Sequence, residues 1–397
     1  MLKGKNILLG VTGSIAAYKL ANLASMLVKL HADVHVIMTK NAESFINPIT
    51  FETLTKNRCY DDTFARTYPV EVSHIALAQR ADAVLVAPAS ANTIAKLAHG
   101  IADDMLTSTL LAVTSPVLVA PAMNVNMFRN PATQDNLDIL RRRGITVIPP
   151  DSGLLACGDT GEGKLPSEQT LCDYLLRAVA KEKDMQGKRV LVTAGPTRES
   201  IDPVRFITNH STGKMGYAVA RQAMLRGAEV TLISGPVSIA PPPFVNMVRV
   251  QSAGEMFEAV RENYEDMDFI IKTAAVADYT PADTKTEKIK KSDDGSDLSL
   301  PLRRTEDILK WLGEHKREGQ KLCGFSMETE NMLENSRAKL TRKNADMIAA
   351  NSLRDEGAGF GTDTNHLVLI TKDSVEDLPL LSKDEAADRV LDTLLKI

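Results

Sequence analysis

Short runs of consecutive apolar residues alternate with helical stretches along the first 150 residues, and this alternation restricts the possible folds more than any other feature. The runs are uninterrupted, as is typical of strands that are covered on both faces of a sheet. We expect such strands at residues 6–12, 34–39, 83–87, 116–120 and 146–149. The helical stretches between them are expected at residues 14–30, 94–113 and 131–143. This order predicts a doubly wound α/β sheet that binds ligands at the carboxyl ends of its strands.

The alternation stops near residue 151 and starts again near residue 189. Residues 151–166 contain four glycines and no periodicity, so we expect a mobile loop there. A helical stretch at 168–181 and a charged segment follow, before the next expected strand at 189–193. A length of 397 residues suits two domains rather than one. The prediction is two doubly wound (Rossmann/flavodoxin-like) parallel-sheet domains, residues 1–185 and 186–397.

The second half repeats the alternation of strands and helices. Its further strands are expected at residues 229–234, 247–250, 269–275, 321–325, 347–349 and 366–371. Its helices are expected at residues 214–226, 255–264, 306–315, 330–343 and 383–395. Residues 281–301 are rich in Lys, Asp and Ser and poor in apolar side chains, so we expect a flexible flap or arm there rather than core.

Composition and charge exclude several classes of protein. The 47 Lys and Arg residues nearly balance the 51 Asp and Glu residues, which argues against a disordered chain and against a nucleic-acid partner. No apolar run reaches the roughly 18 residues of a membrane span, so no membrane partner is expected. The four cysteines are scattered without a C-x-x-C pair. We therefore expect neither a disulfide framework nor a cysteine metal site, and a reduced, cytoplasmic location.

Two turns of the first half place small and hydroxyl residues between a strand and a helix. The turn GVTGSIAAYK follows the first expected strand, and the turn PASANT follows the third. Exposed N–H groups at a helix N-terminus can bind phosphate, although such residues also serve as packing turns and N-caps. Neither turn is a P-loop or a G-x-G-x-x-G motif. Two of them at neighbouring strand ends favour a phosphate-bearing cofactor.

Three single residues of the first half could carry chemistry. His74 follows Ser73, a suitable helix cap, and a helix N-terminus favours the neutral imidazole that a general base needs; a lone histidine is nevertheless more often structural. Asn124, in PAMNVNM, could bind a substrate carboxylate or satisfy loop backbone groups. Cys157, in LACGD, lies on the glycine-rich segment, where a thiol could donate a proton or be inert.

Anion-binding groups also occur in the second half. The segment RFITNHSTGKMG leads into an expected helix and offers the Arg205 guanidinium, the Asn209 amide, hydroxyls and free N–H groups, but it lacks the Walker spacing. Two clusters of basic residues follow, and they could be solvated faces or could clamp a triphosphate. The clusters are Lys288, Lys290 and Lys291, and Lys339, Arg342 and Lys343.

The motifs together carry a resemblance to known enzymes. GSIAAYK, His74, PASANT, PAMNVNM and LACGDTGEGK resemble the flavin-containing cysteine decarboxylases. RFITNHSTGKMG, KTAAVADY, KIKK, GFSMET and KNADMIAAN resemble phosphopantothenate–cysteine ligases. In this order, and over nearly the whole chain, they resemble the bacterial bifunctional enzymes of coenzyme A biosynthesis. The chain departs from that pattern at Lys164, where the family usually has Arg, and at Phe128, which replaces a common Trp.

For the first half, the resemblance implies an FMN-dependent decarboxylase. The flavin would accept electrons from the cysteine moiety, so that loss of CO₂ leaves a conjugated enethiol, and would then return them. His74 would be the base of the oxidative step, Asn124 would bind the substrate carboxylate, and Cys157 would donate a proton in the final reduction. The implied FMN contacts are Gly13, Ser14, Ile15, Thr39, Ser90 and Asn92.

For the second half, the resemblance implies a ligase that uses CTP. The carboxylate of 4'-phosphopantothenate would form an acyl-cytidylate, and the amine of cysteine would then form the amide, with Mg²⁺ and lysines neutralising the phosphates. Asn209 and Arg205 would hold the acyl phosphate and the substrate, and Lys288 would lie on a flap. The implied CTP contacts are Ala274, Ala275, Asp278, Lys288, Phe325, Lys339 and Lys343.

The resemblance also implies a large homo-oligomer, a dodecamer built from trimers and dimers. Two alternatives differ in class. One is a flavin-dependent decarboxylase of peptidyl cysteine, which would have no need of a ligase-like half. The other is a flavin-fold regulatory subunit without catalysis, which the joint presence of His74, Asn124 and Cys157 argues against.

Overall fold

The computed structural model describes residues 1–64, 73–154, 158–290, 298–328, 331–352, 359 and 361–397. The chain forms two compact units, Met1–Glu182 and Lys183–Ile397, and each is described by itself. A functional boundary after residue 185 stays a prediction. None of the helices in the described ranges is long and apolar enough to cross a membrane.

The first unit is built on a six-stranded sheet in the order β3-β2-β1-β4-β5-β6, in which every pairing is parallel. Its strands are β1 (Asn6–Val11), β2 (Asp33–Met38), β3 (Cys59–Tyr60), β4 (Ala83–Ala89), β5 (Val117–Pro121) and β6 (Thr146–Val147). The strand order reverses direction between β1 and β4. In doubly wound sheets, such a reversal opens a crevice at the carboxyl ends of the two strands.

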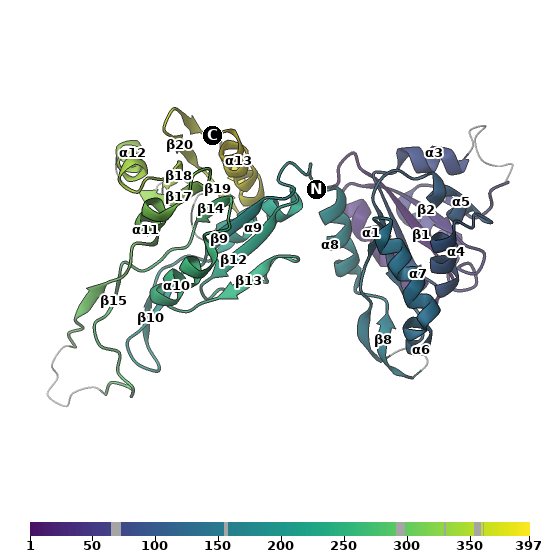
Figure 1. The fold of residues 1–397 in the computed structure, drawn as a ribbon, viewed down its shortest axis with the longest axis horizontal. Helices are drawn as coiled ribbons and strands as arrows, with labels where there is room; N and C mark the ends of the chain where they lie inside the picture. Colours follow the sequence, from purple (N-terminus) through teal and green to yellow (C-terminus); the bar gives the residue numbers. More distant parts are fainter. Residues whose placement is uncertain (65–72, 155–157, 291–297, 329–330, 353–358, 360) are drawn as a thin grey trace. The chain divides into compact units, whose positions relative to one another are not determined.

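Helices cover both faces of this sheet (Figure 1). They are η1 (Ile15–Tyr18, a 3₁₀-helix), α1 (Lys19–Lys29), α2 (Pro48–Thr55), α3 (Ser73–Arg80), α4 (Ala91–His99), α5 (Met105–Ala112), α6 (Val125–Arg129), α7 (Pro131–Arg142) and α8 (Glu168–Val179). Helices α1 and α8 pack side by side, and α8 also packs on β4 and β5. On the other face, α3, α4, α5 and α7 share one buried apolar cluster with β4 that includes Leu77, Ile94, Leu106 and Leu137.

The structure corrects two expectations for the first unit. Residues 94–113 belong to two helices rather than one, because α4 stops at Gly100 in a left-handed conformation and Asp104 caps α5 with a reciprocal capping box. The glycine-rich residues 151–166, expected as a loop, contain an antiparallel hairpin of β7 (Asp151–Leu154) and β8 (Thr160–Lys164). Its strands hold Gly163 at a φ of 125°, which a side chain would disfavour.

The second unit is built on an eight-stranded sheet in the order β13-β12-β9-β14-β17-β18-β20-β21. Its strands are β9 (Arg189–Ala194), β12 (Glu229–Ser234), β13 (Asn246–Arg249), β14 (Phe269–Lys272), β17 (Lys321–Glu328), β18 (Met347–Ser352), β20 (Val368–Thr371) and β21 (Val375–Asp377). The first six strands in this order are parallel. The last two are antiparallel additions, which the expectation of a parallel sheet missed.

Five helices flank this sheet: α9 (Lys214–Leu225), α10 (Ala253–Asn263), α11 (Ile308–His315), α12 (Met332–Arg342) and α13 (Lys383–Lys396). Helices α9 and α13 pack against each other. Three short antiparallel pairs complete the unit: β10 (Arg198–Ser200) with β11 (Phe206–Thr208), β15 (Tyr279–Pro281) with β16 (Leu302–Arg304), and β19 (Thr364–Asn365) with β22 (Leu381–Ser382).

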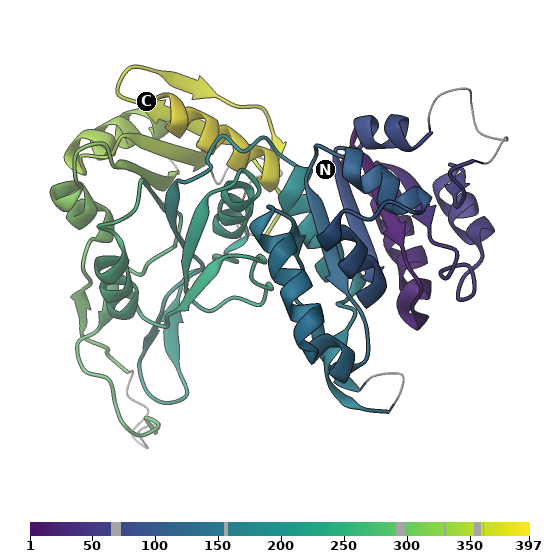
Figure 2. The ribbon, with the colours of Figure 1, turned by 45° about the vertical axis from the view of Figure 1, so that its right-hand side comes forward.

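The β10–β11 and β15–β16 pairs extend away from the main sheet in both views (Figures 1 and 2). β10 contacts β15, so the two pairs form one arm. The arm includes the described part of residues 281–301, the segment expected to be a flap. The predicted α/β class is confirmed, with one doubly wound sheet in each half that is parallel apart from the antiparallel strands β20 and β21.

Candidate functional site

The two small-residue turns of the first unit lie next to each other, at the carboxyl ends of β1 and β4. The fully buried Thr12 joins them, because its hydroxyl donates to the Pro88 carbonyl (2.6 Å) and accepts from the Ser90 N–H (2.9 Å). Ser14 caps η1 and Ser90 caps α4, each through its side-chain oxygen. The structure thus brings the two predicted turns to one edge of the sheet.

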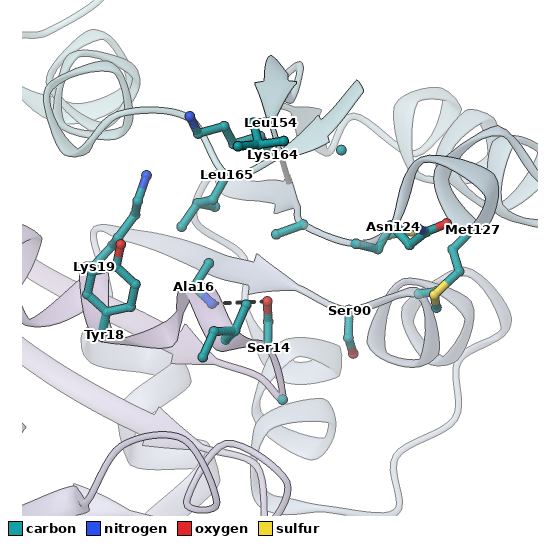
Figure 3. A pocket seen from close by; sticks show the side chains of 16 residues that line it. Ser14, Ala16, Tyr18, Lys19, Ser90, Asn124, Met127, Leu154, Lys164 and Leu165 are labelled. Atoms are coloured by element: carbon teal, nitrogen blue, oxygen red, sulfur yellow. Dashed lines mark hydrogen bonds between the residues drawn. The ribbon is translucent and has the colours of Figure 1, made fainter. Parts of the chain in front are cut away.

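A cavity of about 550 Å³ opens above these turns (Figure 3). Figure 3 shows that Ser14 and Ala16 form one side of the cavity, Asn124 and Met127 form another, and Lys164 faces them from the β7–β8 hairpin. Most of the lining is apolar side chains or backbone, with few polar groups, as is usual for a small-molecule site. The full lining is Gly13, Ser14, Ile15, Ala16, Tyr18, Lys19, Ser90, Ala91, Ala122, Met123, Asn124, Met127, Leu154, Gly163, Lys164 and Leu165.

Four of the six predicted FMN contacts line this cavity: Gly13, Ser14, Ile15 and Ser90. Thr39 and Asn92 do not. Thr39 follows β2 at the same edge of the sheet, where its N–H donates to the Val11 carbonyl (3.0 Å). Asn92 is the second residue of α4, directly behind the lining residue Ala91.

The three candidate catalytic residues of the first unit are placed differently. Asn124 lines the cavity, and its Nδ2 donates to Oδ2 of Asp159 (2.7 Å), next to the β7–β8 hairpin. Its Oδ1 accepts from the Asn126 N–H and caps α6. His74 is the second residue of α3, half-buried, and does not line the cavity. Cys157 lies outside the described residues.

The second unit has a cleft at the carboxyl ends of β14 and β17, with two adjoining lobes. The α9 lobe, of about 370 Å³, reaches Asn209 and the first turn of α9. The α11 lobe, of about 710 Å³, reaches the start of α11 and the basic end of α12. Five residues line both lobes and so mark their junction: Lys272, Val276, Asp278, Phe325 and Lys339.

Most of the predicted ligase residues line this cleft. Ala274 and Ala275 line the α9 lobe with Asn209, whose Nδ2 donates to the Ala275 carbonyl (2.8 Å). Lys343 lines the α11 lobe. The remaining three, Asp278, Phe325 and Lys339, lie at the junction.

Arg205 and Lys288 line neither lobe. The Arg205 guanidinium donates to Asp202 through Nε (2.9 Å) and Nη2 (2.5 Å), and to the Ile289 carbonyl through Nη2 (2.8 Å). Asp202 also accepts from the Ile289 N–H, and the hydrogen bonds from Arg205 lower the pKa of this carboxyl well below its usual range. The pair therefore fastens the segment that carries the exposed Lys288.

The basic residues of the α11 lobe have unequal partners. Lys343 forms an ion pair with Asp307, which caps α11 by accepting from the Lys310 N–H (3.0 Å). Burial alone would raise the pKa of Asp307, but the hydrogen bonds from Lys343 and Lys310 lower it below the usual value. Lys339, by contrast, donates only to the Ser326 hydroxyl (3.4 Å) within the described ranges.

Several lysines of the cleft were missed from the sequence, and two of them carried a usable signal. Lys383, the first residue of α13, is buried and donates to the carbonyls of Gly359 (3.1 Å) and Thr364 (3.0 Å). A cation in the first turn of a helix is unfavourable, and this was a usable signal. Lys272 ends the otherwise apolar strand FIIK at the edge where ligands bind, which was a second signal.

No group of three or more His, Cys, Asp or Glu side chains is arranged to hold a metal ion within the described ranges. The polar groups of the cleft are instead mainly lysines and amides.

Comparison with known proteins divides the chain in the same way. A family model described as "Flavoprotein" matches residues 1–180, and one described as "DNA/pantothenate metabolism flavoprotein C-terminal domain" matches residues 185–397. A crystal structure of the C-terminal domain of a coenzyme A biosynthesis bifunctional protein, CoaBC, is 49% identical, with a TM-score of 0.45, and the match covers 52% of this chain and 94% of that one.

Two full-length relatives have the same name. The coenzyme A biosynthesis bifunctional protein CoaBC of Bacillus subtilis is 49% identical over 395 residues, covering 98% of this chain and 97% of that protein. The protein of that name from Escherichia coli K12 is 42% identical, covering 99% and 97%. The chain therefore belongs to the family of bifunctional enzymes of coenzyme A biosynthesis, with a flavoprotein domain followed by a ligase domain.

Proposed function

We propose that this protein makes 4'-phosphopantetheine in two steps, ligation in residues 186–397 and decarboxylation in residues 1–185. The observation that carries the proposal is the contrast between the two sites of one full-length family member: a mostly apolar cavity at the switch point of one sheet, and a lysine-lined cleft at the strand ends of the other. The first suits a resident flavin, and the second suits a nucleotide and an acidic substrate.

FMN would occupy the first-unit cavity. Ser90 and the N-terminus of α4 offer hydroxyl and N–H groups to its phosphate. At the cavity wall, glycine at position 163 lets the β7–β8 hairpin lie close to the backbone of Met123, because a Cβ there would lie 2.4 Å from the Met123 carbonyl oxygen. When bound, FMN would accept electrons from the cysteine moiety and return them.

The side chains of the first unit would position the substrate and move protons. Asn124 would exchange its hydrogen bond with Asp159 for one to the substrate carboxylate. Cys157 would donate the proton of the final reduction. His74 does not line the cavity of its own chain, so as a base it would act in the cavity of a second copy. This requirement for a second copy agrees with the expected homo-oligomer, a dodecamer built from trimers and dimers. We expect that assembly to be cytoplasmic.

In the second unit, CTP would bind in the α11 lobe and extend across the junction to Ala274 and Ala275. The acyl group of 4'-phosphopantothenate would lie near Asn209 in the α9 lobe. The substrate carboxylate attacks the α-phosphorus and pyrophosphate leaves; the cysteine amine then attacks the acyl carbon and CMP leaves. Lys339 and Lys343 would neutralise phosphate oxygens. Arg205 would position the segment that carries Lys288 over the substrate.

Mg²⁺ would be held mainly by phosphate oxygens and water, with few protein ligands. The cleft fits that mode of binding, since Asp278 is an exposed carboxylate at the junction of the lobes. Magnesium would shield the charge that builds up on the departing pyrophosphate.

The test is to incubate the protein with 4'-phosphopantothenate, cysteine, Mg²⁺ and each nucleoside triphosphate, and to follow pyrophosphate and CO₂ separately. We expect a yellow protein, pyrophosphate release that is fastest with CTP, and CO₂ release that requires the ligated product. Absence of flavin absorbance would overturn the decarboxylase half. Absence of pyrophosphate with every nucleotide would overturn the ligase half.

A further inference from the structure

We propose that Lys272 is a further catalytic residue of the ligase unit, whose ammonium binds the phosphate that joins the nucleotide to the acyl group. This inference rests on the proposed ligase function and deepens it. The sequence motifs give Lys272 no role. Its position in the cleft, at the junction of the two lobes, suggests one.

Lys272 is the last residue of β14, in the middle of the sheet. It pairs with Thr193 of β9 on one side and with Gly324 of β17 on the other. Side chains two residues apart in a strand share a face, and Ile270 is part of the core cluster that contains Ile308 of α11. The Lys272 stem therefore rises from this core to the edge of the sheet, where it lines both lobes.

The charges around Lys272 leave a place for an anion. Lys343, on the same side of the cleft, is already paired with Asp307. Among the residues that the structure describes, Lys339 has only the Ser326 hydroxyl as a partner. The Lys272 ammonium forms neither a hydrogen bond nor an ion pair with any residue that the structure describes. Two partly enclosed ammonium groups, neither of them paired with a carboxylate in the described part of the chain, thus face the junction, and a bound phosphate would compensate their charge.

The pKa of Lys272 agrees with this geometry. Burial, and then the nearby charge of Lys339, lower the pKa of this lysine to about 8, while Asp307 and Asp278 partly oppose the shift. An anion at the junction favours the protonated form and would raise that pKa. In the free protein, a fraction of Lys272 is therefore unprotonated near neutral pH, and binding of the anion would raise the protonated fraction.

The junction identifies which phosphate Lys272 would contact. The acyl-cytidylate has one phosphate between its ribose and its acyl group, and a ligand that spans the two lobes must place that phosphate at their junction. In the first step, the carboxylate oxygen forms a bond to the α-phosphorus, and the bond to the pyrophosphate oxygen breaks with its electron pair. Lys272 stays protonated throughout and stabilises the charge on a non-bridging oxygen, which is strongest in the transition state.

The experiment compares Lys272→Met, Lys272→Arg and a matched control, Lys321→Met, in the full-length protein. Lys321 begins the neighbouring strand β17 and pairs with Phe269, at the opposite end of the same sheet. Pyrophosphate release is measured in a single turnover with 4'-phosphopantothenate, CTP and Mg²⁺, without cysteine. Decarboxylation of supplied 4'-phosphopantothenoylcysteine is measured in parallel as an internal reference.

We expect Lys272→Met to slow pyrophosphate release by about 10²-fold or more, as for loss of one transition-state donor. Lys272→Arg should restore most of the rate, and Lys321→Met should match the wild type. CO₂ release should be unchanged in all three. In the wild type, kcat/KM for CTP should fall above pH 8 as Lys272 loses its proton. In Lys272→Arg, this fall should move to higher pH, since arginine keeps its charge.

Three results would overturn the inference and leave the ligase function standing. They are a Lys272→Met rate within threefold of an active wild type, a rise in KM with kcat unchanged, and an alkaline limb that stays near pH 8 in Lys272→Arg. The third result needs only the arginine variant, so it decides the matter even if the methionine variant is unstable. An inactive wild type with every nucleotide would overturn the ligase function, and the inference with it.

Discussion

The two units are both built on a doubly wound sheet, but their sites are lined by different kinds of residue. In the first unit, β1 and β4 end in turns of glycine, serine and threonine, and the cavity above them is mostly apolar. In the second unit, the turn after β9 is similar, but the cleft is bordered by lysines from β14, α9, α12 and α13. The same strand-end position thus has a mostly apolar lining in one unit and a lysine-rich lining in the other.

This difference matches how long each ligand would stay. A mostly apolar wall suits a cofactor that remains bound, because burial of its flat surface supplies the affinity. Lysines suit a triphosphate that must bind, react and leave, because their attraction depends on the charge of the ligand and falls once pyrophosphate is gone. If the two sites work independently, a substitution in one unit should leave the activity of the other unchanged.

The largest effect is expected for His74→Asn, which should lower CO₂ release by about 10³-fold if His74 is the general base, as proposed. Pyrophosphate release should be unchanged, because His74 belongs to the first unit. His31→Asn is the matched control: this exposed histidine has a φ of 67°, which asparagine tolerates. Loss of both activities in His74→Asn would show that the sites are not independent.

Gly163→Ala should release the flavin and spare the ligase. A Cβ here would lie 2.4 Å from the Met123 carbonyl oxygen, and the φ of 125° is unfavourable for alanine. We expect FMN binding about 30-fold weaker, from a cost of roughly 2 kcal/mol, measured by flavin absorbance after dialysis. Gly144→Ala has a similar positive φ of 82° and no atom within 4 Å of its Cβ, so it should keep the flavin.

Gly216→Ala should lower the stability and the nucleotide affinity of the second unit and leave the first unit unchanged. A Cβ at Gly216, in α9, would lie 2.3 Å from Oγ1 of Thr273 and 2.6 Å from Cβ of Ala194. Pushing α9 off the sheet should cost roughly 1–3 kcal/mol and weaken CTP binding, measured by denaturant unfolding and by nucleotide titration. Flavin content should be unchanged.

The control for that variant is Gly254→Ala, in α10, where the new Cβ meets nothing closer than Oγ of Ser252 at 3.9 Å. It should stabilise the protein by about 0.5–1 kcal/mol, as alanine favours a helix more than glycine does. If both variants were equally stable, the close approach of α9 to β9 would not contribute to the stability of the second unit.

The smallest effect is expected from thiol reagents. Burial, with added repulsion from Asp61 and Glu52, raises the pKa of the Cys59 thiol to about 12, and burial likewise raises the pKa of Cys323. Both should be unmodified by iodoacetamide at pH 8 in the native protein and modified after denaturation, as mass spectrometry of peptides would show. Rapid native labelling of either would mean that its unit opens readily.

Much of the fold could be predicted because its strands are covered on both faces. Buried parallel strands are continuous apolar runs, and β12 was expected at its observed bounds, Glu229–Ser234. The expected strand at residues 366–371 contains β20, but its antiparallel direction could not be foreseen, since direction depends on the connection and not on apolar content. The glycines of residues 151–166 suggested a loop, but β7 and β8 pair there in a hairpin. Glycine is compatible with both structures, so it could not distinguish them.

The site was predictable where a motif is local and not where it depends on distant strands. Gly13, Ser14 and Ser90 occur in turns that can be recognised from their own neighbours. Lys272 and Lys339 come together only because β14 and α12 meet at the same end of the sheet. Asp202 was not singled out either, since its partners Arg205 and Ile289 are joined only by the fold.

Thr12 has a consequence for anyone who wants to redesign the first unit. Its single hydroxyl donates to one turn and accepts from it, so two loops far apart in the sequence are held in one register. They are therefore a single exchangeable part. A chimera that imports the PASANT turn from a relative must bring the residue at position 12 with it, and a library that varies one loop alone samples mostly mismatched pairs.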